Sequence, residues 1–165
     1  MVLLAGVVVA SNRAASGVYA DETGPLIVSA LRDLGFEVGD AVVVPDGPPV
    51  TEAISDLLAQ GARAVLTTGG TGLTPTDLTP EATAPLLDRE VPGIAEAIRA
   101  AGMAKGVPTA VLSRGLAGVA GSCLVVNLPG SRGGVKDALA VLEPVLVHAV
   151  EQVVGSDHPR SGTDA

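Results

Sequence analysis

The sequence predicts an α/β protein, a three-layer α/β/α sandwich with a mostly parallel sheet. Short apolar runs rich in Val and Leu alternate with segments in which apolar residues recur every three or four positions. The first pattern is typical of buried strands and the second of amphipathic helices, and their alternation indicates a parallel sheet with crossover helices. The 165 residues are enough for one domain, which we expect to span residues 1–154.

The composition argues against nucleic acid and membranes as partners. The chain is 47% hydrophobic but has one Phe, one Tyr and no Trp, so its core must consist of Val, Leu, Ile and Ala. Aromatic platforms for bases are lacking, and a net charge of −8 repels nucleic acid backbones and anionic membranes. The single Cys123 cannot form an internal disulfide, which favours a reducing, cytoplasmic location and a structural role for the thiol.

The first half of the chain shows three strand patterns separated by two helix patterns. The apolar run over residues 2–10 indicates a buried strand; the alternative is that residues 1–10 are a signal-peptide core, but no basic segment precedes the run and ten residues cannot span a membrane. Gly35 and Gly61 are placed to end the two helices. The expected order is a strand over 2–10, a helix over 26–34, a strand over 36–44, a helix over 54–60 and a central strand over 63–68.

The second half begins with a helix start, because Thr79 is a good N-cap and Pro80 suits the first helical position. Pro144 lies within the last helix pattern and should kink it. The polar residues 155–165 are expected to be disordered. The expected order is a short helix over 81–87, a helix over 94–101, a short strand over 107–113, a strand over 122–128 and a final helix over 135–153.

Four polar or glycine-rich turns follow predicted strands. Because the carboxyl ends of parallel strands lie at one edge of a sheet, we expect these turns to converge. The central turn has three glycines in four residues, so its backbone can approach a ligand closely and adopt positive φ, although a tight turn alone would also explain it. The turns are residues 11–17, 45–47, 69–77 and 127–131.

Asp46 and Asp77 lie on two of these turns. Asp46 could simply form a turn and Asp77 could simply place charge at a helix start. If both face a ligand cleft, they would hold a divalent cation, because carboxylates beside phosphates otherwise repel them. Mg²⁺ fits best, since it takes one or two carboxylates and completes its shell with phosphate and water oxygens.

The turn over residues 127–131 combines a strand end with a helix start. Ser131 can cap that helix while backbone amides point outward, which would suit an anion but is also the pattern of any capped helix. Ser113 and Arg114 add a hydroxyl and a cation after the short predicted strand, although Arg114 could equally be a surface residue.

Six motifs of the chain occur in an order and at a spacing that are familiar together. They are Ser11-Asn12-Arg13 with Ser16-Gly17-Val18-Tyr19 and Asp21, Pro45-Asp46, Thr67-Thr68-Gly69-Gly70-Thr71-Gly72 with Asp77 and Thr79-Pro80-Glu81-Ala82-Thr83, Pro92-Gly93, Leu112-Ser113-Arg114, and Asn127-Leu128-Pro129-Gly130. With these motifs the chain resembles the Mog/MoaB family of molybdopterin adenylyltransferases over residues 2–154. Asn12 departs from the pattern, since many members have Asp there.

The resemblance implies a homotrimeric enzyme of molybdenum cofactor biosynthesis. In that reaction the terminal phosphate of molybdopterin attacks the α-phosphorus of Mg-ATP, which yields adenylyl-molybdopterin and pyrophosphate and prepares the pterin for molybdate insertion. Docking to a molybdenum-insertion protein is a further implication. A non-catalytic molybdopterin carrier of the MoaB type is the alternative, whereas a nucleotide-binding oxidoreductase fits poorly because the glycine motif is not GxGxxG.

The resemblance also implies roles for individual residues. Asp46 and Asp77 match the catalytic pair and would handle Mg²⁺ and nucleotide. The nucleotide phosphates would contact Thr68, Gly69, Gly70, Thr71 and Gly72. The residues that match the molybdopterin site are Ser11, Ser113, Arg114, Ser122, Asn127, Pro129, Gly130 and Ser131.

Overall fold

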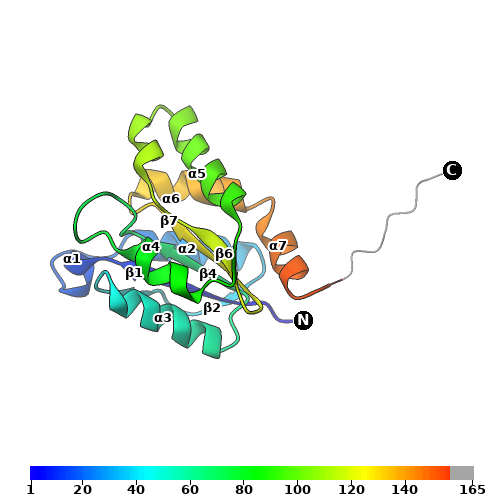
Figure 1. Ribbon diagram of the computed structural model, residues 1–165. Coiled ribbons are helices and arrows are strands. Elements are labelled where there is room, and N and C mark those ends of the chain that lie inside the picture. Colours follow the sequence, from blue (N-terminus) through cyan, green and yellow to red (C-terminus); the bar gives the residue numbers. More distant parts are fainter. Residues whose placement is uncertain (157–165) are drawn as a thin grey trace.

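A seven-stranded sheet forms the middle layer of the protein, and helices cover both of its faces (Figure 1). The computed structural model describes residues 1–156. The strands are β1 (Leu4–Ala10), β2 (Glu37–Val38), β3 (Val42–Val44), β4 (Ala64–Thr68), β5 (Arg89–Glu90), β6 (Ala117–Ala120) and β7 (Cys123–Leu128). Their order is β2-β1-β4-β7-β6-β5, with β3 also paired to β1. Strands β1 to β4 and β7 pair in parallel, whereas β6 is antiparallel to both β7 and β5, which confirms the predicted mostly parallel sandwich.

The helices connect these strands and form the two outer layers. They are α1 (Asn12–Ala15), α2 (Thr23–Asp33), α3 (Pro48–Ala59), α4 (Thr79–Thr83), η1 (Ala84–Leu86), α5 (Pro92–Ala104), η2 (Pro108–Leu112), α6 (Arg132–Leu142) and α7 (Leu146–Val153). The pair α5 and η2 extends beyond the sheet at the top of Figure 1. Across residues 1–156, none of the helices has both the length and the apolar character that a membrane crossing requires.

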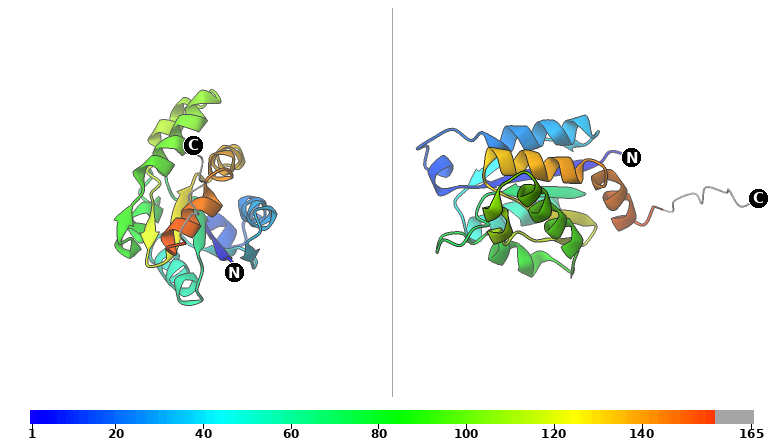
Figure 2. Two further views of the ribbon diagram at one scale, coloured as in Figure 1. Left: turned by 90° about the vertical axis from the view of Figure 1, so that its right-hand side faces the viewer. Right: turned by 90° about the horizontal axis from the view of Figure 1, so that it is seen from above.

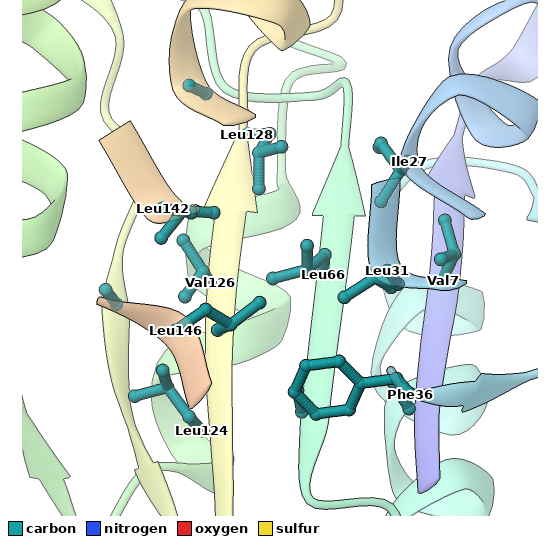
Figure 3. Close-up of a cluster of buried hydrophobic side chains, with 14 of the residues drawn as sticks. Val7, Ile27, Leu31, Phe36, Leu66, Leu124, Val126, Leu128, Leu142 and Leu146 are labelled. Carbon is teal, nitrogen blue, oxygen red and sulfur yellow. The ribbon is translucent and has the colours of Figure 1, made fainter. Parts of the chain in front are cut away.

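The core is divided in two because successive side chains of a strand point to opposite faces. Val7 of β1 and Leu66 of β4 pack on one face with α2, α6 and α7, whereas their neighbours Val8 and Val65 pack on the other with α3 (Figures 2 and 3). Burial of both faces explains why the strands are almost continuously apolar.

Leu66 lies fully buried in the middle of the first of these clusters, between the sheet and the helices (Figure 3). We expect Leu66→Ala to lower the free energy of unfolding by about 2–5 kcal/mol, because the surrounding sheet can close the resulting cavity only in part. Val18→Ala, at a side chain that is 71% exposed, should change it by less than about 0.5 kcal/mol. Urea unfolding of the two variants measures both values, and equal effects would contradict this assignment of the core.

Two predicted elements are each divided in the structure. The expected strand over 36–44 is interrupted over residues 39–41, so that β2 and β3 pair separately with β1. The expected helix over 135–153 does not merely kink at Pro144 but ends, and a turn separates α6 from α7. Pro144 has no N–H to continue the helical hydrogen bonds, and the break lets α7 pack against β7.

The predicted strand over 107–113 is wrong, because residues 108–112 form the 3₁₀ helix η2. Pro108 removes one N–H, and the apolar side chains of Val111 and Leu112 are exposed. The strand in this region is β6, which joins β7 through Gly121-Ser122, with Gly121 at φ +58°. Gly-Ser between two apolar runs is a hairpin signal that the sequence analysis missed.

Candidate functional site

The four predicted turns converge at the carboxyl edge of the sheet, as expected. They follow β1, β3, β4 and β7, which are parallel neighbours. The backbone N–H of Asp46 donates to Asn12 Oδ1 at 3.0 Å, which joins the turns after β3 and β1. The hydroxyl of Thr68 donates to the carbonyl of Pro129 at 2.7 Å, which joins the turns after β4 and β7.

The first of these turns, residues 11–17, contains the single helical turn α1. The hydroxyl of Ser11 caps it by accepting the N–H of Ala14 at 3.1 Å. Asn12 is the first residue of α1, and its side chain therefore reaches the turn that carries Asp46. Asn12 thus has a structural role at the site, because its side-chain oxygen accepts the backbone N–H of Asp46.

The glycine turn after β4 depends on two positive φ angles, +88° at Gly69 and +66° at Gly70. A Cβ on Gly69 would lie 2.3 Å from the carbonyl oxygen of Ala10. A Cβ on Gly70 would lie 2.3 Å from Asp46 Oδ2 and 2.2 Å from Thr79 Oγ1. Only glycine therefore lets the turn pass this close to β1 and to the Asp46 carboxylate.

The Asp46 carboxylate is held by backbone donors through one oxygen. Asp46 Oδ1 accepts the N–H of Gly47 at 2.8 Å and that of Leu78 at 3.1 Å, and the Thr79 hydroxyl lies at 3.5 Å. Thr79 was expected as an N-cap, but it is the first residue of α4 and its hydroxyl turns to Asp46. Burial raises the pKa of Asp46, the charge of Asp77 raises it further, and the backbone donors oppose the shift.

The raised pKa of Asp46 predicts a cost of keeping this carboxylate charged in the folded state. Because the folded pKa lies above the usual value, the wild type should lose stability relative to Asp46→Asn as pH rises from below 3.8 through the folded pKa. We expect Asp46→Asn to be the more stable protein at pH 7 and to lose that advantage near pH 3.8. Denaturant unfolding at several pH values measures this, with the exposed Asp40→Asn as control; a pH-independent difference would contradict it.

Asp77 lies at the far end of the loop that begins with the glycine turn. Its Oδ2 accepts the N–H of Thr74 at 2.9 Å and the Thr74 hydroxyl at 2.8 Å, while its own N–H donates to the Thr74 carbonyl at 3.0 Å. A Cβ on Gly72 would lie 2.7 Å from Asp77 Oδ2. Like Asp46, Asp77 is therefore packed directly against a glycine of the turn.

The carboxylates of Asp46 and Asp77 suit a cation whose remaining ligands come from a bound substrate and from water. Their hydrogen bonds go to Asp46 Oδ1 and Asp77 Oδ2, so in the described part of the chain one oxygen of each remains for a ligand. Over the same residues no group of three or more His, Cys, Asp or Glu side chains could hold a metal alone. A cation bound by these two carboxylates would therefore need further ligands from a substrate or from water.

Two cavities flank the glycine turn. The first, of about 480 Å³, is lined by Ser11, Tyr19 and Gly69 among others. The second, of about 550 Å³, lies between the glycine turn and α5 and is lined by Gly72 and Asp77. Gly130 borders both, and a Cβ there would lie 3.2 Å from Gly69 Cα, so the two cavities meet where the turns after β4 and β7 touch.

Asp46 lines neither cavity, whereas most of the other predicted site residues border one of them. Ser113 lines the second, together with Pro129, Gly130 and Ser131. Ser131 caps α6, its hydroxyl accepting the N–H of Gly134 at 3.0 Å, as expected. The amino end of α6 therefore opens onto the second cavity.

Three residues that the resemblance assigned to molybdopterin, namely Asn127, Ser122 and Arg114, line neither cavity. Asn127 is only 3% exposed, and its carboxamide donates to Thr67 Oγ1 at 2.9 Å and Thr83 Oγ1 at 3.1 Å and accepts the Leu116 N–H at 3.0 Å. All its hydrogen-bonding groups are used inside the protein. Ser122 precedes β7, at the edge of the sheet opposite the turns, where its hydroxyl accepts from the Arg63 guanidinium.

Two residues that had no role assigned from the sequence also lie at the site. Tyr19 and Asp21 line the first cavity, and the Tyr19 hydroxyl lies 3.2 Å from Ser11 Oγ. Asp21 accepts the N–H groups of Thr23 and Gly24 at the start of α2, both at 3.1 Å. An acidic residue just before a helix is a capping signal that could have identified Asp21.

Comparisons with known proteins find relatives named for molybdenum cofactor biosynthesis. A protein of Synechococcus elongatus named "Molybdenum cofactor biosynthesis bifunctional protein" is 41% identical over 94% of this chain, which spans 49% of that protein. A "Molybdopterin adenylyltransferase" of Helicobacter pylori is 33% identical, with 92% of this chain and 88% of that protein covered. The solved structure of the Mog protein from Mycobacterium ulcerans superposes with a TM-score of 0.87 at 53% identity, covering 92% of this chain and 99% of that one.

A family model described as "Probable molybdopterin binding domain" matches residues 6–148, which include all four turns and both aspartates. The match extends over both outer layers and the whole parallel part of the sheet, apart from the first residues of β1. The chain therefore belongs to this family of molybdopterin-binding domains of molybdenum cofactor biosynthesis.

Proposed function

We propose that this chain is a molybdopterin adenylyltransferase. An oxygen of the terminal phosphate of molybdopterin attacks the α-phosphorus of Mg-ATP, the bond from that phosphorus to the bridging oxygen breaks, and pyrophosphate leaves. The observation that carries the proposal is the pair of aspartates, each with one oxygen left for a ligand, packed against a glycine turn between two cavities. The chain spans about half the length of two bifunctional relatives. The proposed activity is therefore that of this chain alone and not that of those longer proteins.

This chemistry requires positioning and charge neutralisation rather than a protein nucleophile, since the attacking group belongs to the substrate. Mg²⁺, bound with the nucleotide, would neutralise phosphate charge, and Asp46 and Asp77 are the residues that would hold it. The turn over Gly70 to Gly72 offers backbone amides to the nucleotide phosphates. The amino end of α6, capped by Ser131, offers its amides to an anionic group in the second cavity.

We also propose that the protein is a cytoplasmic homotrimer that docks a molybdenum-inserting protein. Support for self-association comes from exposed apolar side chains around the second cavity, on the glycine loop, α5 and η2. Those of Leu73, Met103, Val107, Val111 and Leu112 are between 46% and 64% exposed. Light scattering on the purified protein tests the trimer, and a monomeric mass would contradict it.

The reaction is tested by following pyrophosphate release from the purified protein with molybdopterin and ATP. We expect release to require both substrates and to stop when EDTA removes Mg²⁺, because the phosphates then face the two aspartates without a cation. A carrier would bind molybdopterin with no dependence on Mg-ATP and no release of pyrophosphate. Release that continued unchanged in EDTA would contradict the role proposed for the metal.

A further inference from the structure

Arg114 spans the loop that connects the glycine turn to α4. Its backbone N–H donates to the carbonyl of Thr71 at 2.8 Å, and its Nε donates to the carbonyl of Gly72 at 2.8 Å. At the other end of the loop, Nη2 donates to the carbonyl of Asp77 at 2.7 Å. Both terminal nitrogens also contact the carboxylate of Glu81, and this ion pair raises the pKa of Arg114 and lowers that of Glu81.

These contacts leave the guanidinium little to offer a substrate. Each of its three nitrogens already donates to a protein oxygen. Two of these oxygens are the loop carbonyls of Gly72 and Asp77, and the third belongs to the Glu81 carboxylate. Within the loop, Asp77 and Thr74 bond to each other through backbone and carboxylate. Arg114 therefore holds the loop near its two ends, at Gly72 and at Asp77. The Asp77 carboxylate holds the middle of the loop through Thr74.

Glu81 has a distinct part in this arrangement. It lies in the first turn of α4, close in sequence to Leu78, whose N–H donates to Asp46, and it fixes the plane of the guanidinium. The Arg114–Glu81 pair thus links the elements that position the two aspartates. A planar fork can bind carbonyls and a carboxylate in one plane, whereas a lysine ammonium cannot reproduce that geometry.

We propose that Arg114 is a positioning residue, which fixes the Asp77 carboxylate and the glycine turn for adenylyl transfer, and that Glu81 orients Arg114. The molybdopterin-binding role that the resemblance implied is replaced by this one. The catalytic consequence rests on the proposed function, whereas the ordering of the loop does not.

The test is Arg114→Lys, which keeps the charge and loses the fork, compared with Arg89→Lys at an exposed arginine of β5. We expect the Arg114 variant to exchange the amide hydrogens of Thr74 and Asp77 at least about tenfold faster, with an unchanged global unfolding midpoint. We expect kcat to fall roughly 10- to 100-fold while KM for molybdopterin stays within about twofold, because the attacking geometry is lost and pterin contacts remain. The Arg89 variant should match the wild type in all of these measurements.

Glu81→Gln is the second variant, because it keeps Arg114 and removes only its ionic partner. It should change loop exchange and kcat in the same direction as Arg114→Lys and by less. If Arg114 binds substrate instead, Arg114→Lys should raise KM for molybdopterin and leave loop exchange unchanged, and that result would overturn the proposal. If the wild type transfers no adenylyl group, the proposed function fails and amide exchange alone decides whether Arg114 orders the loop.

Discussion

Asp77→Ala is expected to slow adenylyl transfer at least about 100-fold while the affinity for molybdopterin is retained. The Asp77 carboxylate borders the second cavity and has one oxygen left for a ligand, so its loss removes charge where Mg²⁺ and the α-phosphate must meet. Initial rates with saturating Mg-ATP measure the first effect, and equilibrium dialysis of molybdopterin measures the second.

Two further variants show whether the charge of Asp77 or its place in the loop is responsible. Asp77→Asn keeps an oxygen for the Thr74 donors and should lose nearly as much activity as Asp77→Ala, because the missing feature is the negative charge. Asp40→Ala, at an exposed carboxylate on the loop between β2 and β3, should have wild-type rates. Near-normal turnover of Asp77→Ala would remove this residue from the mechanism.

Gly70→Ala should produce the second large effect. A Cβ there would lie 2.3 Å from Asp46 Oδ2 and 2.2 Å from Thr79 Oγ1, and the residue has φ +66°. We expect the free energy of unfolding to fall by about 1–3 kcal/mol and transfer to slow about 100-fold, because Asp46 or the turn must move. Thermal or urea unfolding and initial rates measure the two effects.

Gly35→Ala separates backbone strain from the clash. Gly35 has φ +90°, but nothing lies within 4 Å of the position of its Cβ. The Gly35 variant should therefore lose about 1 kcal/mol of stability from strain and keep wild-type turnover. Similar losses of turnover in both variants would show that reduced stability, and not the displaced Asp46, lowers the rate.

The fold could be predicted because its signals are local and repeated. Alternation of apolar strands with helices indicated the parallel sandwich, and the positions of polar turns after strands indicated where a site would form. These signals depend on burial and on strand direction, which short sequence windows record well. The hairpin of β6 and β7 was missed because Gly118 and the small residues around it give β6 a weak apolar pattern. The prediction of disorder for residues 155–165 falls mostly outside the described residues 1–156.

The site could be predicted only in part, because a motif gives a residue's position in the chain and not the direction of its side chain. Asp46, Asp77 and the glycine turn lie together as expected. Asn127, at the end of β7, instead points into the core and joins β4, α4 and the segment before β6. Arg114 matched the family motif as well, yet its contacts are with the loop it holds and with Glu81 of α4. Neither orientation follows from sequence spacing.

We propose that the site between the two cavities transfers the adenylyl group of ATP to molybdopterin. The most direct test is to incubate the purified protein with Mg²⁺, molybdopterin and ATP labelled at the α-phosphate, and to ask where the label goes. We predict label on the pterin, one pyrophosphate released for each pterin labelled, and neither with Asp77→Ala. If the wild-type protein binds molybdopterin fully but never labels it, that result would contradict this proposal and indicate a non-catalytic molybdopterin carrier.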